Sequence, residues 1–441
     1  MPDTVQGFNT QYGFRKYDYN ALANLPQVTP QMYGAVGDGV TDDTEAIQTA
    51  LNSGNVLFPE GTYLISSTLT LNGHNQIVCA TSGKTVILAA DTLASEMFVV
   101  DGSLSPAYRS NQQLSNLCLK GNGTCTGIRF HMNADFFLNN VQISDCEWGL
   151  IFDDALMYRI CATSVIGCAN GIKFLNSTDL SASNNACFEM CKINSIAKFA
   201  IYSESEDSTH NVVFNCCEIE ATNTSESDIS PITLQSLSTS GASPIMVFRN
   251  CWFESNHGTV PVSITGTDGG QKQYVFDGCT IVNTANACDY FIKAVGRTLV
   301  MLNQNDPSMY NEKTVSVESG YLFVMGGILT YDIDDENRAT HLGYEGQINS
   351  NLTLRQGHGT IYKSAGGSDS NKIYGESNKL KIVADTNTVL LDGAKGVQLQ
   401  NSYLKPLIIG SVYLWSYNNT IYVKHGSYPT AYNDGTVLIT L

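Results

Sequence analysis

The middle of the chain alternates apolar and polar residues in short runs that return at a regular spacing. Three matching tetrapeptides begin at Gly127, Gly149 and Gly171, and each reads glycine, Ile or Leu, any residue, phenylalanine. Their constant separation of 22 residues, with alternation of period two inside each run, predicts short strands with one buried side. A strand that returns in every repeat, without the 3.6-residue period of a helix, is typical of a β-solenoid.

A column of cysteines continues the repeat further along the chain. Each cysteine precedes a large apolar residue by two positions, in the pairs Cys191–Ile193, Cys217–Ile219, Cys251–Phe253 and Cys279–Ile281. Period-two alternation predicts that both members of each pair face inward. The inward column is therefore aligned as Ile143, Ile166, Ile193, Ile219, Phe253 and Ile281. Because the 13 cysteines lack the paired spacing of a metal site, we expect buried, reduced thiols that pack as small apolar side chains.

The residues ahead of the repeat predict a cap for the solenoid. Residues 40–51 have the pattern of a short amphipathic helix with Thr/Asp at its N-terminus, and Asn52 to Gly54 end it. An open solenoid end exposes its core, so a capping element is required. Residues 56–65 predict a strand, a Pro/Gly turn and a second strand.

Three regions are expected from these patterns. Residues 1–30 form an N-terminal arm, residues 31–310 form the parallel β-helix with the functional face, and residues 311–441 form a C-terminal β domain for trimerisation or carbohydrate binding. The last region contains short alternating runs such as residues 379–383 and 412–415, which predict strands.

Composition excludes several classes of function. The 441 residues carry a net charge of −17, which disfavours nucleic-acid binding. No apolar run reaches the ~18 residues of a membrane span, so no membrane insertion is expected. Residues 1–11 lack the basic start and apolar stretch of a secretory signal. The acids between Asp38 and Asp43 do not follow the calcium-loop spacing, and we predict neither a metal nor a cofactor.

The first part of the predicted solenoid resembles a known family. The segment Tyr33 to Asp43 (YGAVGDGVTDD), followed by Ala46-Ile47 and by Phe58 to Tyr63 (FPEGTY), is similar to the entry segment of pectate-lyase-like right-handed β-helices. This segment is common in bacteriophage tailspikes and polysaccharide-degrading enzymes, and residues 404–436 also resemble tailspike endings. The resemblance implies a homotrimeric virion protein, joined to a phage tail or baseplate protein. It also implies binding and depolymerisation of a bacterial capsule, exopolysaccharide or O-antigen.

Residues beside the inward column bring three acids together. The position before the column is occupied by Lys192, Glu218 and Trp252 in successive repeats, and the position after it by Asn194, Glu220 and Glu254. Equivalent positions on neighbouring strands lie ~4.8 Å apart. Paired carboxyl groups are what glycoside hydrolysis requires, and mutual repulsion raises the pKa of one of them. An exposed tryptophan suits the apolar face of a sugar ring.

The sequence leaves the stereochemistry open. Stacked Glu220 and Glu254 would be about 5–6 Å apart, as in a retaining glycosidase, whereas diagonal Glu218 and Glu254 at about 7–8 Å would suit inversion. Residues 222–243, the longest insertion, are expected to wall the groove.

Further residues are expected to bind substrate around these acids. Asn194 and Glu189 would line the groove, Arg249 and Lys192 would hold an anionic sugar, and His210 and His257 would flank it as acid/base helpers. Asp145 and the pair Asp153-Asp154 are expected to be solvated turn acids or further sugar subsites.

Two alternatives remain beside the hydrolase. A polysaccharide lyase would use a basic residue on the same face to abstract a proton. A receptor-binding spike would adhere to the host without catalysis.

Overall fold

The computed structural model describes residues 27–71, 76–80, 84–103, 109–177, 183–203, 209–222, 229–236, 245–258, 260–266, 272–283, 290–296, 298–303, 306–310, 313–318 and 321–325. Towards the C-terminus it describes residues 359–362, 371–376, 379–384, 387–392, 396–399, 407–409, 412–417, 420–425, 427, 430 and 436–440. The expected arm, residues 1–30, therefore lies almost wholly outside the described residues. The chain divides into two compact units, Met1–Tyr344 and Glu345–Leu441.

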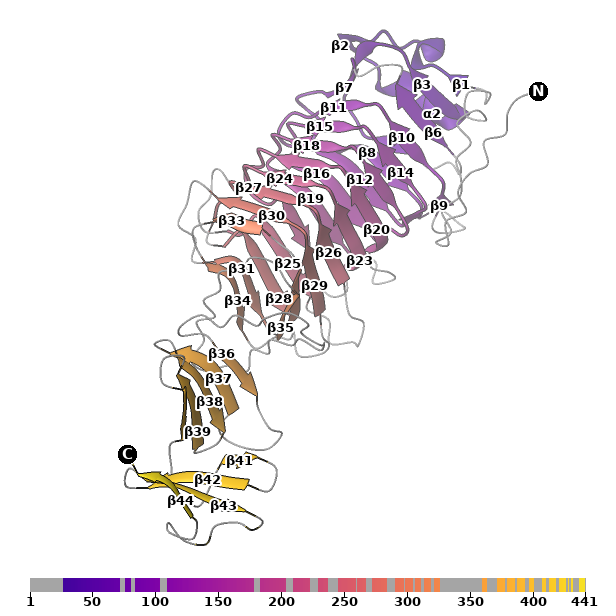
Figure 1. Cartoon of the computed structure of the whole chain (residues 1–441). Helices are drawn as coiled ribbons and strands as arrows, with labels where there is room; N and C mark the ends of the chain where they lie inside the picture. The colour runs from indigo at the N-terminus through magenta and orange to yellow at the C-terminus, as the bar shows by residue number, and fades with distance from the viewer. Residues whose placement is uncertain are drawn as a thin grey trace, which may run out of the picture. The chain divides into compact units, whose positions relative to one another are not determined.

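Three long parallel sheets form the first unit, and the chain passes through them in the repeating order A, B, C (Figure 1). Sheet A contains β1 (Gln27–Val28), β3 (Asn55–Phe58), β6 (Ile77–Ala80), β10 (Gln113–Ser115), β14 (Phe137–Asn139), β17 (Arg159–Cys161), β20 (Ser183–Glu189), β23 (Thr209–Asn215), β26 (Ile245–Arg249), β29 (Lys272–Asp277), β32 (Thr298–Asn303) and β35 (Tyr321–Met325). Sheet B contains β2 (Asp38–Asp42), β4 (Gly61–Ile65), β7 (Thr85–Ala89), β11 (Cys118–Lys120), β15 (Gln142–Ser144), β18 (Ser164–Ile166), β21 (Lys192–Asn194), β24 (Glu218–Glu220), β27 (Trp252–Glu254), β30 (Thr280–Asn283) and β33 (Asp306–Tyr310). Sheet C contains β5 (Leu69–Leu71), β8 (Glu96–Asp101), β12 (Thr126–His131), β16 (Trp148–Asp153), β19 (Asn170–Leu175), β22 (Ile201–Ser203), β25 (Ile232–Ser236), β28 (Val262–Gly266), β31 (Tyr290–Val295) and β34 (Lys313–Glu318). A small pair, β9 (Arg109–Ser110) and β13 (Asn133–Ala134), lies beside sheet A. The predicted all-β parallel β-helix is confirmed.

Tight corners fix the register of the short sheet B strands. The corner from sheet A to sheet B has one residue with a left-handed backbone in coil after coil, among them Met190, Cys216 and Asn250. The corner that leaves sheet B also has a residue with a left-handed backbone, at Ala221 and Ser255. Left-handed backbone turns the chain sharply within one residue. Each three-residue strand is therefore held at both ends, and its outward side chains cannot slip along the neighbouring strand.

The core stacks like residues on like residues. Phe188, Phe214, Phe248 and Phe276 form a ladder with ring centroids 4.5, 5.1 and 5.0 Å apart. The predicted cysteine column is buried beside it, and its thiols are reduced. These thiols donate to backbone carbonyls of the preceding coil, as between Cys251 Sγ and the Phe214 oxygen at 3.4 Å. The column thus satisfies its weak donors inside an apolar core.

The inward column departs from the alignment at one position. Val165, not Ile166, pairs with Ile143 and Ile193 and is buried, whereas Ile166 is half-buried on the outer face. The strand Ser164–Ile166 places two β-branched apolar residues next to each other, so alternation alone does not distinguish the inner from the outer one.

The predicted cap is confirmed, but its helix begins later than expected. The helix α2 spans Thr44–Ser53, and residues Asp38–Asp42 instead form β2. A 3₁₀ helix, η1 (Pro30–Tyr33), precedes them. Asp42 accepts hydrogen bonds from the Thr44 amide and hydroxyl, while buried Asp43 accepts from the Val36 and Gly37 amides. The acids of the entry segment therefore hold the cap together.

The ladders of the solenoid extend past residue 310. Strands β34 and β35 pair in parallel with β31 and β32, so coils continue to Met325. Residues 314–331 are apolar and Gly-rich, so the alternation of apolar and polar residues that predicts a strand is not visible there in the sequence. The second unit contains two antiparallel sheets. They are formed by β36 (Gly359–Tyr362), β37 (Asn371–Glu376), β38 (Lys379–Ala384), β39 (Asn387–Asp392) and β40 (Gly396–Leu399), and by β41 (Leu407–Ile409), β42 (Val412–Tyr417), β43 (Thr420–His425) and β44 (Thr436–Thr440).

Candidate functional site

Three consecutive strands of sheet B present the cluster predicted from the sequence, and its acids lie on the last two of them. Strands β21, β24 and β27 are hydrogen-bonded neighbours in parallel register. Their central residues Ile193, Ile219 and Phe253 are buried, and this alternation turns the residues on either side outward. The cluster therefore stands on the outer wall of the solenoid.

The register brings Glu220 and Glu254 side by side. They are directly paired positions on adjacent strands, as are Glu218 and Trp252. On the other side of β24, Lys192 pairs with Glu218 and Asn194 pairs with Glu220. The expected adjacency of the two acids is confirmed. The side chains of Glu218 and Glu220 are 35% and 31% exposed, so solvent and ligands can reach both.

Each carboxylate has a different set of partners. Lys192 Nζ lies 2.5 Å from Glu218 Oε1 and 4.0 Å from Glu220 Oε2. The ring nitrogen of Trp252 donates to Glu254 Oε2 at 2.8 Å. Lys192 thus neutralises chiefly Glu218, and Trp252 fixes the orientation of Glu254 while the residue remains 40% exposed.

These contacts give neighbouring carboxyl groups different proton affinities. A hydrogen bond with Glu218, together with partial burial and the charge of Glu218, raises the pKa of Glu220. The same hydrogen bond, together with Lys192, lowers the pKa of Glu218 despite its partial burial. One proton shared by two nearby acids therefore resides on Glu220.

Other predicted binding residues surround the cluster and are already ion-paired. Arg249 ends β26, one corner before Trp252, and its Nε lies 3.3 Å from Asp277 Oδ2. Glu189 ends β20 and pairs with Arg159. These residues line the edge between sheets A and B.

The two histidines have unlike positions. His257 follows Glu254 on the corner that leaves sheet B, where its amide donates to the Thr222 oxygen at 3.0 Å. His210 lies near the start of β23, whereas the corner leading to Glu218 follows the end of that strand at Asn215. The left-handed backbone of Asn211 turns the chain between His210 and the rest of β23. Four strand residues, or ~13 Å, then separate that turn from the corner, so the fold does not bring His210 to the acids.

The expected wall of residues 222–243 is not one insertion. Residues Ile232–Ser236 form β25, a regular strand of sheet C. A sheet C strand therefore interrupts the segment. Residues 223–228 and 237–243 lie outside the described residues, as does any wall that they form.

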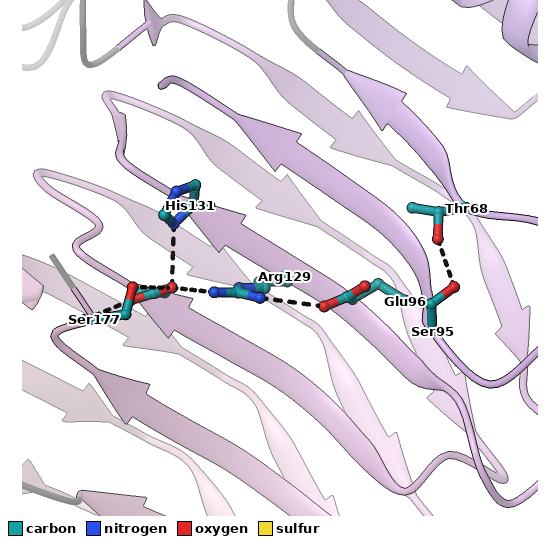
Figure 2. A network of polar contacts seen from close by, with 7 residues as sticks. Thr68, Ser95, Glu96, Arg129, His131 and Ser177 are labelled. Atoms are coloured by element: carbon teal, nitrogen blue, oxygen red, sulfur yellow. Dashed lines mark hydrogen bonds and ion pairs between the residues drawn. The ribbon is translucent and has the colours of Figure 1, made fainter. Parts of the chain in front are cut away.

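Sequence reasoning missed a second polar cluster, on the outer face of sheet C. Asp153 is fully buried and accepts hydrogen bonds from Arg129, from His131 Nδ1 at 3.1 Å, and from the Ser177 hydroxyl at 2.8 Å and amide at 3.0 Å. Figure 2 shows Arg129 between Glu96 and the end of the network where His131 and Ser177 lie. Asp153 is therefore neither a solvated turn acid nor an exposed sugar contact. Aligning the outward residues of the three Gly127, Gly149 and Gly171 repeats would have placed Arg129 near it.

The sheet C cluster holds a fixed charge. Burial would raise the pKa of Asp153, but hydrogen bonds from Arg129 and Ser177 outweigh burial and lower it.

Among the residues that the structure describes, no group of His, Cys, Asp and Glu side chains is arranged to hold a metal ion. No helix in the described ranges is long and apolar enough to cross a membrane.

Parts of this chain are similar in sequence to known proteins. The profile of the family "Rhamnogalacturonase A/epimerase, pectate lyase-like" matches residues 31–107. Mannuronan C5-epimerase AlgE2 of Azotobacter vinelandii is 36% identical over 103 residues, which cover 20% of this chain and 10% of that protein. The tail spike protein of Shigella phage Sf6 is 26% identical over 178 residues, which cover 35% of this chain and 27% of that protein. The chain thus spans a small part of the curated relatives that it matches.

The whole fold also has a solved counterpart. The enzymatically active domain of tailspike protein 2 from bacteriophage CBA120 superposes with a TM-score of 0.56 at 12% identity, over 93% of this chain and 78% of that one. The chain therefore has the fold of a right-handed parallel β-helix, and its residues 31–107 match the pectate-lyase-like family model. Its fold resembles that of bacteriophage tailspikes.

Proposed function

We propose that the protein is a homotrimeric phage tailspike that binds and hydrolyses a bacterial surface polysaccharide, such as a capsule, an exopolysaccharide or an O-antigen. The observation that supports hydrolysis best is the direct pairing of Glu220 and Glu254 on the outer wall, with the pKa of Glu220 raised. In this proposal the protein acts at the bacterial cell surface and is attached to the phage tail or baseplate through another virion protein.

The two acids have complementary roles. Glu220 keeps a proton and donates it to the glycosidic oxygen as the bond to the anomeric carbon breaks. The Glu254 carboxylate, held by the Trp252 ring N–H, attacks that carbon and forms a glycosyl ester. Water then displaces Glu254 and gives its proton to Glu220, which restores both groups. Directly paired strands are ~4.8 Å apart, close to the carboxyl separation of retaining enzymes.

Neighbouring residues support this reaction. Glu218, kept ionised by Lys192, repels a second negative charge on Glu220 and so keeps its proton in place. The exposed Trp252 ring offers a platform for a pyranose. We assign Asn194, Glu189, Arg249 and His257 to the rim of the binding site. His210 is left out of it because of its place on β23.

Glu254→Gln and Glu220→Gln test the proposal. Each variant keeps the side-chain shape but removes the nucleophile or the acid, and we expect at least a thousandfold loss of reducing ends released from purified capsular polysaccharide. Glu45→Gln, an exposed position on α2, is the matched control and should be fully active. Full activity of Glu254→Gln would remove this site.

The products separate the alternatives. A retaining hydrolase releases a product with the anomeric configuration of the substrate, which NMR reads directly. Ultraviolet absorbance from an unsaturated uronate would instead identify a lyase. Binding to capsulated cells without any cleared halo would identify a receptor-binding spike.

A further inference from the structure

The outer face of sheet C has a row of side chains that the sheet B site does not use. Arg129, Ile151, Lys173 and Tyr202 occupy directly paired positions on the consecutive strands β12, β16, β19 and β22. We call these four residues the sheet C row. It follows the stacking direction of the coils, on a different sheet from Glu220 and Glu254.

The centre of the row is a cation that lies over two aromatic rings. Lys173 Nζ lies 5.4 Å from the Trp148 ring centroid and 5.7 Å from the Tyr202 ring centroid. The two rings are 6.2 Å apart and tilted by 48°, and Phe199 lies 4.7 Å from Tyr202. Both the lysine and the two flanking rings are only half-buried. An ammonium group beside open aromatic faces can attract an acidic group while the rings pack against the C–H face of a sugar.

The end of the row at Arg129 is held rigid from beneath. The buried Asp153 accepts from Arg129 and His131, and Glu96 contacts the other guanidinium nitrogen at 3.4 Å. The Arg129 and His131 side chains are still 32% and 24% exposed. A buried carboxylate that fixes two partly exposed donors is the kind of support that positions groups for a ligand.

The spacing and charge of the row indicate the ligand. Arg129 and Lys173 are two strands apart, or ~10 Å, so both can contact one oligosaccharide that runs along the stacked coils. The chain has a net charge of −17, which repels an acidic glycan elsewhere on its surface. A cation beside aromatic rings, with a second cation ~10 Å away, therefore favours the acidic parts of a saccharide.

We propose that the sheet C row, with Trp148, is a binding site for carboxylate-bearing oligosaccharides, namely those with uronate, sialate or pyruvate-ketal groups. It is separate from the hydrolytic site proposed on sheet B, and its binding does not depend on cleavage. Affinity arises from Lys173 and Arg129 at the carboxylates and from Trp148 and Tyr202 at the sugar faces.

Calorimetry on the full chain tests the site. The protein bears Glu254→Gln so that no ligand is consumed. The ligands are a mannuronate hexamer, oligosialic acid and a pyruvylated oligosaccharide, with maltohexaose as the neutral control. We expect at least one acidic ligand to bind, maltohexaose not to bind, and affinity to fall as salt rises. Lys173→Gln should weaken binding about tenfold or more, as expected for a hydrogen bond to a charged group.

Two further variants sharpen the result. Lys173→Arg keeps the charge and should retain most of the affinity. Lys293→Gln removes the same charge at the equivalent register position of sheet C, four strands beyond Lys173 and outside the sheet C row, where Ser263 and Ser316 flank it, and should leave affinity unchanged.

Three results would overturn this assignment. They are no binding of any acidic ligand, equal binding by the wild-type and Lys173→Gln proteins, or equal losses with Lys173→Gln and Lys293→Gln. A change of oligomeric state in Trp148→Ala with glycan binding intact would also refute it, because the row would then be a subunit interface. Inactivity of the wild-type protein on polysaccharides would remove the proposed hydrolase but leave this binding result standing.

Discussion

The outer faces of sheets B and C hold carboxylates in opposite ways. On sheet B, Glu218, Glu220 and Glu254 are half-exposed and crowded, with Lys192 as the nearby cation. On sheet C, Asp153 is fully buried, yet Arg129, His131 and Ser177 surround it with donors. The more exposed Glu220 has the raised pKa, and the more buried Asp153 has the lowered one.

Burial alone therefore does not create a proton donor in this protein. Hydrogen bonds to the charged form outweigh desolvation at Asp153, whereas Glu220 meets another carboxylate, which raises its pKa. The first arrangement gives a fixed charge that positions its neighbours. The second gives a group that can exchange a proton, which is what acid catalysis requires.

Removing the fixed charge should have the largest effect on stability. Asp153→Asn leaves Arg129 beside a neutral amide on a partly buried face, and we expect a loss of about 3 kcal/mol in the free energy of unfolding. Asp145→Asn is the matched control, because Asp145 is exposed and asparagine tolerates its left-handed backbone. That control should change stability by less than about 0.5 kcal/mol. Urea denaturation measures the stability of both variants. Equal midpoints for the wild-type and Asp153→Asn proteins would show that the Asp153 charge does not stabilise the sheet C cluster.

The same variant has a signature in pH. The pKa of Asp153 is lower in the folded state than its ordinary value of 3.8, so its contribution is present above that value and is lost as pH falls through the folded pKa. The wild-type protein should therefore lose its advantage over Asp153→Asn in acid below about pH 3.8. A difference that persists unchanged there would contradict the ionic origin of the effect.

Removing a charge beside Glu220 should shift its pKa and so alter the pH profile of the proposed hydrolysis. Glu218→Gln removes the charge that raises the pKa of Glu220. The acid then loses its proton at lower pH, so the descending limb of kcat/KM should move towards acid and activity near neutral pH should fall. Lys192→Gln should move that limb the other way, because Lys192 lowers the pKa of Glu220. Shifts in the same direction for both variants would refute the roles given to this pair.

The sequence was sufficient for the sheet B cluster because one inward column determined its register. Cys217-x-Ile219 and Cys251-x-Phe253 have identical spacing, so Glu220 and Glu254 follow at equivalent positions. Ile166 was misplaced because the neighbouring valine fits the core equally well. The repeats at Gly127 and Gly149 align Arg129 and His131 with Ile151 and Asp153, but they do not show that Asp153 is buried. The burial of Asp153 depends on contacts with side chains of neighbouring coils, and the alternation of apolar and polar residues does not predict those contacts.

Loss of the Trp252 hydrogen bond should cost less than loss of an acid. Trp252→Phe keeps an aromatic platform but cannot donate to Glu254. We expect kcat to fall about tenfold, the low end for a hydrogen bond to a charged group, with KM nearly unchanged. Trp252→Ala should raise KM as well, because the platform is removed. A Trp252→Phe protein with normal kcat would mean that Glu254 needs no orienting donor.

Arg249→Gln should have the smallest effect and completes the contrast between exposed and buried pairs. The Arg249 side chain is 53% exposed, and its Nε lies 3.3 Å from Asp277 Oδ2. Exposed pairs contribute about 0–1 kcal/mol, so the free energy of unfolding should change by less than 1 kcal/mol. At the rim of the proposed site, Arg249 should strengthen binding of an acidic polysaccharide by only about threefold, an effect that vanishes at high salt. A loss of stability as large as that of Asp153→Asn would show that exposure does not separate the two kinds of pair in this fold.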